Sequence, residues 1–281
     1  MIEFPCAKIN LGLNITERRP DGYHNLQTVF YPIPLHDALE IGTMHKDFPS
    51  AIDCDLKMTG NNLCCNEADN LIVKAYNLLA QDFTMSRVYA HLYKHIPSEA
   101  GLGGGSSDAA FMIRLLNREF NLGISNDKME KYAARLGADC AFFIKSEPVY
   151  AEGIGEKLSS VTITEDNLKG YTIVVVKPAI AVSTKEAFSH ITPRKPIRCC
   201  KDIVAQPVST WRGSLTNDFE DSVFLIHPEL AAIKERLYGM GALYAQMSGS
   251  GSSLFGLFKN DIEPKAAEHE FAECNTFTLK L

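Results

Sequence analysis

The chain has 281 residues, of which 46% are hydrophobic and 22% are charged, and its net charge is −6. This composition is that of a soluble globular protein, and the length predicts one large domain or two modest ones. The negative charge gives no reason to expect a nucleic-acid or membrane partner, because a basic surface is the sign of either.

The N-terminal sequence and the spacing of the cysteines predict the cellular compartment of the protein. Residues 1–8 carry a charge inside an apolar stretch and lack a basic start, so we expect no signal peptide, and no run of 18 apolar residues occurs. The eight cysteines form no Cys-x-x-Cys pair, and the adjacent pairs at 64–65 and 199–200 are poor spacing for metal ligands. We therefore expect a cytoplasmic protein with reduced thiols.

The first 60 residues predict strands over 7–15, 26–33 and 38–41, with turn residues at 19–22. Alternation along the first strand puts Lys8 and Asn10 on one face. A lysine and an amide side by side in an apolar strand are suited to orienting a hydroxyl and a carboxylate. The alternative is an exposed polar edge of a half-solvated strand.

A helix is predicted over 69–83 and a strand over 87–96. His91 and His95 are spaced like metal ligands on a helix, but their segment alternates as a strand and contains no His-Glu-x-x-His motif. We therefore expect no metal site at these histidines.

A glycine-rich loop over 97–110 carries the strongest functional signal, because a helix is predicted to start near Ser106, directly after four glycines in five positions. Unpaired N–H groups and the positive end of the helix dipole then point at one spot, which favours phosphate binding. No Lys-Ser or Lys-Thr follows, so this is not a Walker A loop, and no dinucleotide-binding unit is evident. The alternative is a flexible loop or a tight turn.

Helices are predicted over 106–120 and 127–136, the second ended by Gly137. Asp139 then lies between a helix end and a predicted apolar strand, where bulky neighbours exclude water. A buried carboxylate is costly without a cation, and Lys8 is the candidate partner. The alternative is an aspartate that ends a helix in a turn.

The polar stretch 159–170 predicts a boundary between a domain of residues 1–160 and a domain of residues 161–281. The second half predicts an α+β layer. Its strands are expected at 171–177, 243–247, 253–258 and 276–279, and its helices at 229–237 and 264–273. The small-residue loop 248–253 could let the backbone close over a nucleotide, or it could be a permissive hairpin.

Several of these segments resemble the GHMP small-molecule kinases. The resemblance rests on Lys8-Ile9-Asn10-Leu11, on 97–110, on Gly137-Ala138-Asp139 and on Ser248-Gly249-Ser250-Gly251. Segments 21–28, 69–72 and 216–220 resemble the members that act on 4-diphosphocytidyl-2-C-methyl-D-erythritol, and 21–28 resembles their cytidine-binding signature. The motifs occur in the right order over residues 6–258.

The resemblance implies an α+β, two-domain GHMP kinase fold, with an N-terminal domain like ribosomal protein S5 domain 2 and a ferredoxin-like C-terminal domain. It implies transfer of a phosphoryl group from ATP, with Mg²⁺, to the 2-hydroxyl of that substrate in non-mevalonate isoprenoid biosynthesis. Lys8 and Asp139 would be the catalytic pair. Asn70 would lie near the adenine or ribose, and the ATP phosphates would be held by Pro97, Ser98, Glu99, Ala100, Gly101, Leu102, Gly103, Gly104, Gly105, Ser106 and Ser107.

The same resemblance implies how the cytidyl substrate binds. Tyr23 would stack on cytosine with Phe188 as a second face, and His24 would hydrogen-bond the base edge. Asn10 and Thr184 would meet the methylerythritol end. The chain departs from the family at Ala141, where proline is common, and its match around 182–188 is less close.

Two other functions stay open. A sister kinase would act on mevalonate, homoserine or a sugar, but the Gly22-Tyr23-His24 signature argues against it. A nucleotide-binding module without catalysis would have no need of Lys8 and Asp139. We expect a small-molecule substrate and a monomer or weak homodimer; the Mg²⁺ ligands are not predicted.

Overall fold

The computed structural model describes residues 1–47, 49–50, 52–61 and 69–281, and this part of the chain forms two compact units. The first unit consists of residues 1–7, 35–98 and 103–147, and the second of residues 8–34, 99–102 and 148–281. The chain therefore passes five times from one unit to the other, after Ala7, Pro34, Ser98, Leu102 and Glu147. The cysteine pair 64–65 lies outside the described residues.

A four-stranded sheet in the order β1-β4-β6-β5 forms one layer of the first unit. Strands β5 and β6 pair in parallel, and the other neighbours are antiparallel. The side chains of β6 alternate, with Val88 buried and Tyr89 exposed, as the sequence predicts. The bounds of these strands are β1 Ile2–Glu3, β4 Ala38–Thr43, β5 Cys54–Gly60 and β6 Val88–Lys94.

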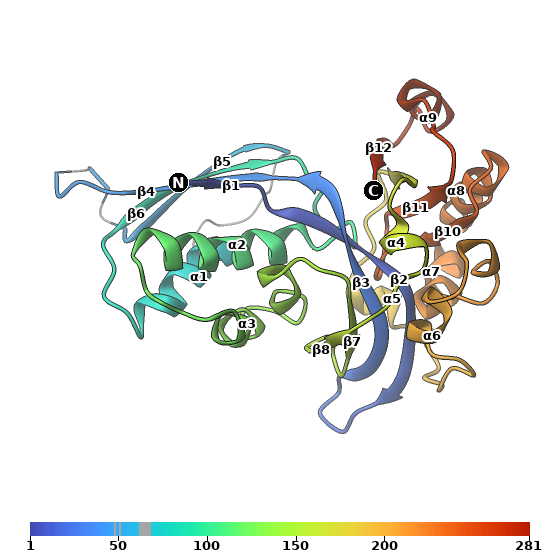
Figure 1. The fold of residues 1–281 in the computed structure, drawn as a ribbon, viewed down its shortest axis with the longest axis horizontal. Helices are drawn as coiled ribbons and strands as arrows, with labels where there is room; N and C mark the ends of the chain where they lie inside the picture. The colour runs from blue at the N-terminus through green and yellow to red at the C-terminus, as the bar shows by residue number, and fades with distance from the viewer. Residues whose placement is uncertain (48, 51, 62–68) are drawn as a thin grey trace. The chain divides into compact units, whose positions relative to one another are not determined.

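Three helices cover one face of this sheet, as Figure 1 shows: α1 (Leu71–Ala80), α2 (Gly104–Glu119) and α3 (Asn126–Ala134). Helix α2 buries Ala109, Met112 and Leu116, which share one face at helical spacing. The segment after Asp139 is not the predicted strand but a short 3-10 helix, η2 (Ala141–Ile144). Its four apolar side chains are all buried, so the apolar run is explained by packing rather than by a sheet.

A second sheet, in the order β2-β3-β7-β8, contains the two longest strands, β2 (Cys6–Arg18) and β3 (His24–His36). Both confirm strands predicted from the sequence, and both are longer than predicted. The predicted turn joins them, with Gly22 at φ 88° donating its N–H to Arg19 O at 3.1 Å. Strands β7 (Val149–Glu152) and β8 (Lys157–Ser160) were not predicted.

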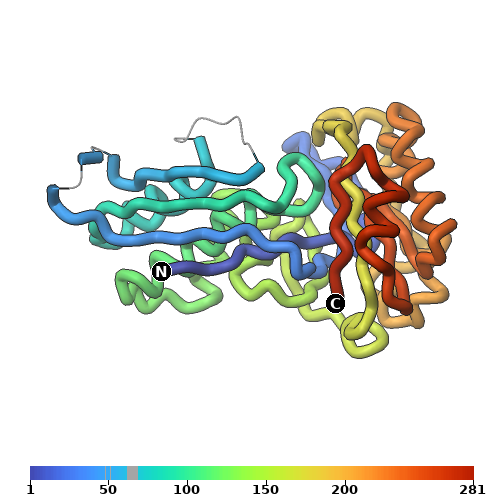
Figure 2. The backbone as a smooth tube through the Cα atoms, turned by 90° about the horizontal axis from the view of Figure 1, so that it is seen from above, coloured from blue at the N-terminus to red at the C-terminus, as the bar shows by residue number. Residues whose placement is uncertain are grey.

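The C-terminal sheet of the second unit has the order β10-β11-β9-β12 and is antiparallel throughout. Strand β9 is central and almost wholly apolar, and β12 lies beside it, as Figure 2 shows. Helix α8 packs on β10 and β11, and α9 packs on β12. The bounds are β9 Thr172–Lys177, β10 Tyr244–Met247, β11 Leu254–Phe258, β12 Asn275–Lys280, α7 Asp218–Ile226, α8 Pro228–Gly239 and α9 Pro264–Glu270.

Short helices complete the second unit: α4 Thr164–Leu168, α5 Thr184–Ala187, α6 Cys200–Val204 and η3 Val208–Thr210. The domain boundary between residues 1–160 and residues 161–281 stays a prediction. Among the described residues, no helix has the length and apolar character needed to cross a bilayer.

Candidate active site

Lys8 and Asn10 lie in the N-terminal part of β2 and are both buried, with exposed fractions of 3% and 1%. Lys8 Nζ donates to Asn10 Oδ1 at 2.7 Å, and Asn10 Nδ2 donates to Thr28 Oγ1 on β3 at 2.9 Å. Lys8 Nζ also lies 5.1 Å from the ring centre of Phe30. The alternative of an exposed polar strand edge is therefore wrong. Such a buried polar chain fixes the lysine in one orientation.

The glycine-rich loop leads directly into α2, which begins at Gly104, two residues earlier than predicted. Gly103 is the N-cap residue and has the left-handed φ of 71°. Gly101 has φ 72°, and a Cβ there would lie 2.0 Å from Ser248 O, so only glycine fits. The loop is held to β2 by a hydrogen bond of 2.9 Å from Lys8 N to Leu102 O. Backbone contact thus ties the loop to the strand that carries Lys8.

A buried ionic cluster in the first unit supports the glycine loop from both sides. Lys94 Nζ, at the end of β6, donates to Asp37 and also to Asp108 Oδ2 at 2.8 Å. Asp37 Oδ1 accepts the N–H groups of His95 and Ile96 at 2.6 and 2.8 Å, immediately before the loop. Asp108 lies in α2, just after the loop. No local sequence pattern predicts this cluster.

The charges of this cluster are unequal, since one lysine faces two carboxyl groups. Burial raises the pKa of Asp108 to about 8, against the opposing pull of Lys94. Burial alone would lower the pKa of Lys94, but the Asp108 and Asp37 carboxylates raise it. Burial therefore favours the neutral form of Asp108 at neutral pH, while Lys94 stays charged.

Asp139 is half-buried in the turn between α3 and η2, in the first unit. Its position is set by a hydrogen bond of 3.1 Å from Cys140 N to Gly137 O. The Cys140 side chain is in turn hydrogen-bonded to the Ser106 side chain in the first turn of α2, and burial raises the pKa of the Cys140 thiol to about 11. The turn that carries Asp139 is thereby joined to the helix start after the glycine loop. Lys8, by contrast, belongs to the second unit.

The residues predicted to bind the cytidyl group lie near the tip of the β2–β3 hairpin and at α5. The rings of His24 and Phe188 are stacked at 4.5 Å with an angle of 16° between their planes. Tyr23 was predicted to share the cytosine with Phe188, but in the structure its side chain is exposed on the turn. Burial first, and then the charge of Arg18, lower the pKa of His24, so the stack is between neutral rings at neutral pH. Thr184 is exposed and begins α5.

Asn70 is the N-cap residue of α1. Its Oδ1 accepts the N–H of Ile72 at 2.9 Å, and its Nδ2 contacts Met58 Sδ at 3.3 Å. This residue therefore has a structural role in the helix start, beside the adenine or ribose contact predicted for it.

A second loop, Ser248–Gly251 between β10 and β11, contacts the glycine-rich loop within the second unit. Ser248 Oγ donates to Gly101 O at 2.9 Å. A Cβ at Gly249 would lie 3.4 Å from both Asn10 Oδ1 and Gly101 O. The weak sequence signal at 248–253 thus marks a segment packed against two predicted site residues.

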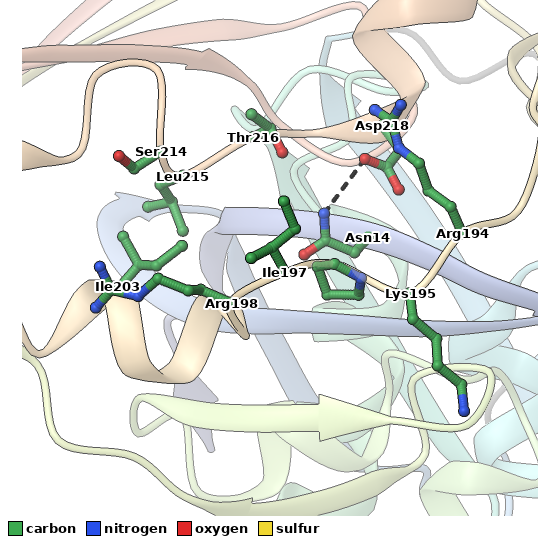
Figure 3. Close-up of a pocket in the computed structure, with 11 residues that line it drawn as sticks. Asn14, Arg194, Lys195, Ile197, Arg198, Ile203, Ser214, Leu215, Thr216 and Asp218 are labelled. Carbon is green, nitrogen blue, oxygen red and sulfur yellow. Dashed lines mark hydrogen bonds between the residues drawn. The ribbon is translucent and has the colours of Figure 1, made fainter.

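A separate surface pocket of about 400 Å³ lies in the second unit and contains none of the predicted site residues. Asn14 and Asp218 form one wall of it, joined by a hydrogen bond of 3.2 Å (Figure 3). Three cationic side chains, Arg194, Lys195 and Arg198, surround it. Figure 3 shows that they point in different directions rather than toward one centre, so the pocket does not form a focused anion site.

Two family models match this chain: the GHMP kinases N terminal domain over residues 70–147 and the GHMP kinases C terminal model over residues 203–275. A protein of Bacteroides fragilis named 4-diphosphocytidyl-2-C-methyl-D-erythritol kinase is 54% identical over 280 residues, which are 100% of both chains. A protein of the same name from Parabacteroides distasonis is 47% identical over 98% of this chain and 97% of its own.

Solved structures give the same picture of the fold. A crystal structure of 4-(cytidine 5'-diphospho)-2C-methyl-D-erythritol kinase has a TM-score of 0.79 and 29% identity, over 99% of this chain and 98% of the other. The mevalonate kinase of Methanococcus jannaschii has a TM-score of 0.73 over 100% and 98%, but at 15% identity it shares the fold alone. The predicted α+β fold of two GHMP kinase domains is confirmed.

Proposed function

This chain belongs to the GHMP kinase family, in the branch of the 4-diphosphocytidyl-2-C-methyl-D-erythritol kinases, and we propose that it catalyses their reaction. In that reaction the γ-phosphoryl group of ATP is transferred to the 2-hydroxyl group of 4-diphosphocytidyl-2-C-methyl-D-erythritol, a step of non-mevalonate isoprenoid biosynthesis. The donor, ATP, is that of the whole family.

The observation that carries the proposal for the site is a pair of hydrogen bonds to the central part of the glycine-rich loop, at Leu102 and at Ser106. In the second unit, Lys8 N donates to Leu102 O at 2.9 Å. In the first unit, the Ser106 side chain is hydrogen-bonded to the side chain of Cys140, the residue that follows Asp139. Both proposed catalytic residues thus belong to segments joined to the loop that would hold the ATP phosphates. Phosphoryl transfer asks mainly for such positioning and for neutralisation of charge.

We assign the chemistry as follows. Asp139 accepts the proton of the attacking hydroxyl, and Lys8 stabilises the developing alkoxide. Asn10 accepts a hydrogen bond from Lys8 Nζ, which directs the ammonium group along a fixed line. The N–H groups of the glycine loop and of the first turn of α2 bind the phosphates.

The residues around the helix start fit a Mg²⁺ ion bound together with the phosphates. Ser107 Oγ is buried and, in the described part of the chain, has no hydrogen-bond partner. Mg²⁺ typically takes one or two protein oxygens and completes its shell with phosphates and water. Ser106 and Ser107 are the side chains that would hold it, and the ion would neutralise charge on the phosphate oxygens.

The cytidyl group would be recognised at His24 and Phe188, with Tyr23 closing over it from the turn and with Asn10 and Thr184 at the polyol end. Stacking and hydrogen bonds to a remote base supply binding energy that helps to orient the reacting hydroxyl.

A coupled assay of ADP release tests the proposal. We expect turnover with 4-diphosphocytidyl-2-C-methyl-D-erythritol and none with mevalonate or homoserine. Turnover with another acceptor alone would keep the kinase chemistry and overturn the substrate. Folded protein that binds ATP but releases no ADP with any acceptor would indicate a binding module. A cytoplasmic location and a monomeric or weakly dimeric state stay predictions from the sequence.

A further inference from the structure

The segment Thr216–Glu220 enters α7 and has no role in the site described so far, although the sequence singles it out. Asn217, the N-cap residue of α7, is 2% exposed and makes three side-chain hydrogen bonds. Its Oδ1 accepts the N–H of Phe219 at 3.0 Å, which is ordinary helix capping. Its Nδ2 donates to two further carbonyl groups, Met247 O and Gly249 O, both at 2.8 Å. Capping does not require these two bonds.

Those two bonds fix the backbone on either side of Ser248. Ser248 Oγ donates to Gly101 O at 2.9 Å, and Ser253 N donates to Ala100 O at 3.2 Å. Ser248 O is also the atom that excludes any side chain at Gly101. The conformation of the glycine-rich loop at residues 100–101 therefore depends on where the 247–249 backbone is held.

The neighbours of Asn217 anchor the same end of α7 on other elements. Glu220 Oε1 accepts the N–H of Met247 at 2.8 Å. Asp218 Oδ2 accepts the N–H of Ile15 on β2 at 2.8 Å, and its Oδ1 accepts from Asn14, as Figure 3 shows. The start of α7 is thus a buried polar cluster that connects β2, which carries Lys8, with the loop that supports Gly101.

We propose that Asn217 is a positioning residue for the ATP phosphates: through the 247–249 backbone and Ser248 it sets the conformation of the glycine-rich loop at Gly101. The inference rests on the proposed function for the assignment of that loop to ATP. It predicts that Asn217 affects ATP binding much more than binding of the acceptor.

Two variants test this. Asn217→Ser keeps a side-chain oxygen that caps α7 but lacks the amide donor, and Ser248→Ala removes the hydroxyl that donates to Gly101 O. We expect each to weaken binding of a non-hydrolysable ATP analogue by about three- to tenfold, the usual effect of one hydrogen bond. The KM for the cytidyl substrate should change less than twofold. Because both variants act on one loop, the double variant should lose less than the product of the two single losses.

The control is Ile233→Val, which trims the core of the same unit. It should lower the melting temperature without changing the affinity for the ATP analogue. Equal rises in the KM of both substrates, multiplicative losses in the double variant, or a melting shift in Asn217→Ser without a change in ATP affinity would overturn the proposal. If Asn217→Ser does not fold, Ser248→Ala still tests the contact on which the proposal depends, and normal binding of the ATP analogue by this variant would overturn the proposal.

The binding measurement also separates this inference from the proposed function. Calorimetry with the ATP analogue needs no acceptor, so it reports on Asn217 even if the wild type fails to phosphorylate the cytidyl substrate. A wild type that turns over its acceptor while both variants bind the analogue normally would reject Asn217 and leave the function intact.

Discussion

Asp139 is the side chain on which the proposed chemistry depends most directly, and asparagine keeps its shape while removing its basicity. We expect Asp139→Asn to lower kcat by about two orders of magnitude or more, with little change in ATP affinity. The coupled assay gives kcat, and calorimetry gives the affinity. Asp127→Asn, an exposed position on α3 of the same unit, is the matched control. Near-normal turnover by Asp139→Asn would remove this residue from the mechanism.

Tyr23 tests the cytidine assignment, because its ring is exposed and its removal leaves the core intact. We expect Tyr23→Ala to raise the KM for the cytidyl substrate by about three- to tenfold and to leave the KM for ATP unchanged, because the lost contact is an aromatic stack. Tyr23→Phe keeps the ring and should behave as wild type. Equal damage to both KM values would assign Tyr23 a structural role instead.

Asp108 gives a prediction about stability and pH. The pKa of Asp108 is about 8 in the folded protein and 3.8 for a free side chain. Between these values the folded state keeps a proton that the unfolded state has lost, so this residue makes stability fall as pH rises. An amide resembles the protonated carboxyl group and does not titrate.

Asp108→Asn should therefore gain stability relative to wild type as pH rises from 4 to 8, by up to about 1.4 kcal/mol per pH unit. Urea unfolding at a series of pH values measures this difference. A difference that stays constant over the range would mean that Asp108 is ionised in the folded protein.

At the scale of elements, the glycine-rich loop depends on backbone conformation rather than on side chains. Gly101→Ala places a methyl group against Ser248 O at a left-handed φ. We expect it to cost more stability than the about 1–2 kcal/mol of the left-handed φ alone, because of the added clash, and to weaken ATP binding at least tenfold. Gly239→Ala, in a helix with nothing within 4 Å, should keep full stability and activity. Normal ATP binding by Gly101→Ala would show that this loop does not need its observed conformation.

The elements that the sequence predicts correctly are those with a recognisable run or repeat of apolar residues. Strand β9 has a run of apolar residues, and α2 repeats its apolar residues at helical spacing. Strands β7 and β8 are four residues each and bury only Tyr150 and Ala151 between them, so they lack the apolar pattern that marks the equally short but fully buried β10. The segment after Asp139 is apolar because it is buried, and burial alone does not distinguish a strand from a 3-10 helix.

The site residues also divide into those that a local sequence pattern relates and those that only the tertiary fold brings together. Lys8 and Asn10 were found because both lie on one strand, two residues apart, where alternation places them together. Lys94 and Asp37 are 57 residues apart, and Asn217 and Met247 are 30 apart. No local pattern relates such partners, because only the tertiary fold brings them into contact. The roles of Tyr23 and Thr184 came from family motifs and stay predictions.

For the whole molecule, the five passages of the chain between the units predict how it unfolds. Two of these passages lie within or next to strands β2 and β3, so loss of one unit removes backbone constraints on the other. We expect one cooperative transition. The single tryptophan, Trp211, reports on the second unit, where its ring is fully buried and its Nε1 donates to Gln206 O at 2.8 Å.

Leu116→Ala, in the core of α2 in the first unit, is the test. It should destabilise the protein by about 2–5 kcal/mol and shift the tryptophan fluorescence and far-ultraviolet circular dichroism transitions together. A fluorescence transition that stays at the wild-type midpoint while the dichroism shifts would show that the units unfold separately.

The stacking of His24 on Phe188 lowers the apparent affinity of any planar ligand that has to take the place of His24. A heterocycle that stacks on the face of Phe188 covered by His24 must displace an imidazole whose ring centre lies 4.5 Å from that of Phe188. The measured affinity is then the intrinsic affinity multiplied by the fraction of molecules whose rings are apart. A small isolated aromatic fragment gains too little binding free energy to displace the imidazole. A base tethered to groups that bind elsewhere can supply that free energy. Inhibitor searches at this position should therefore begin from compounds in which an aromatic ring is joined to a second group that binds elsewhere, rather than from single rings.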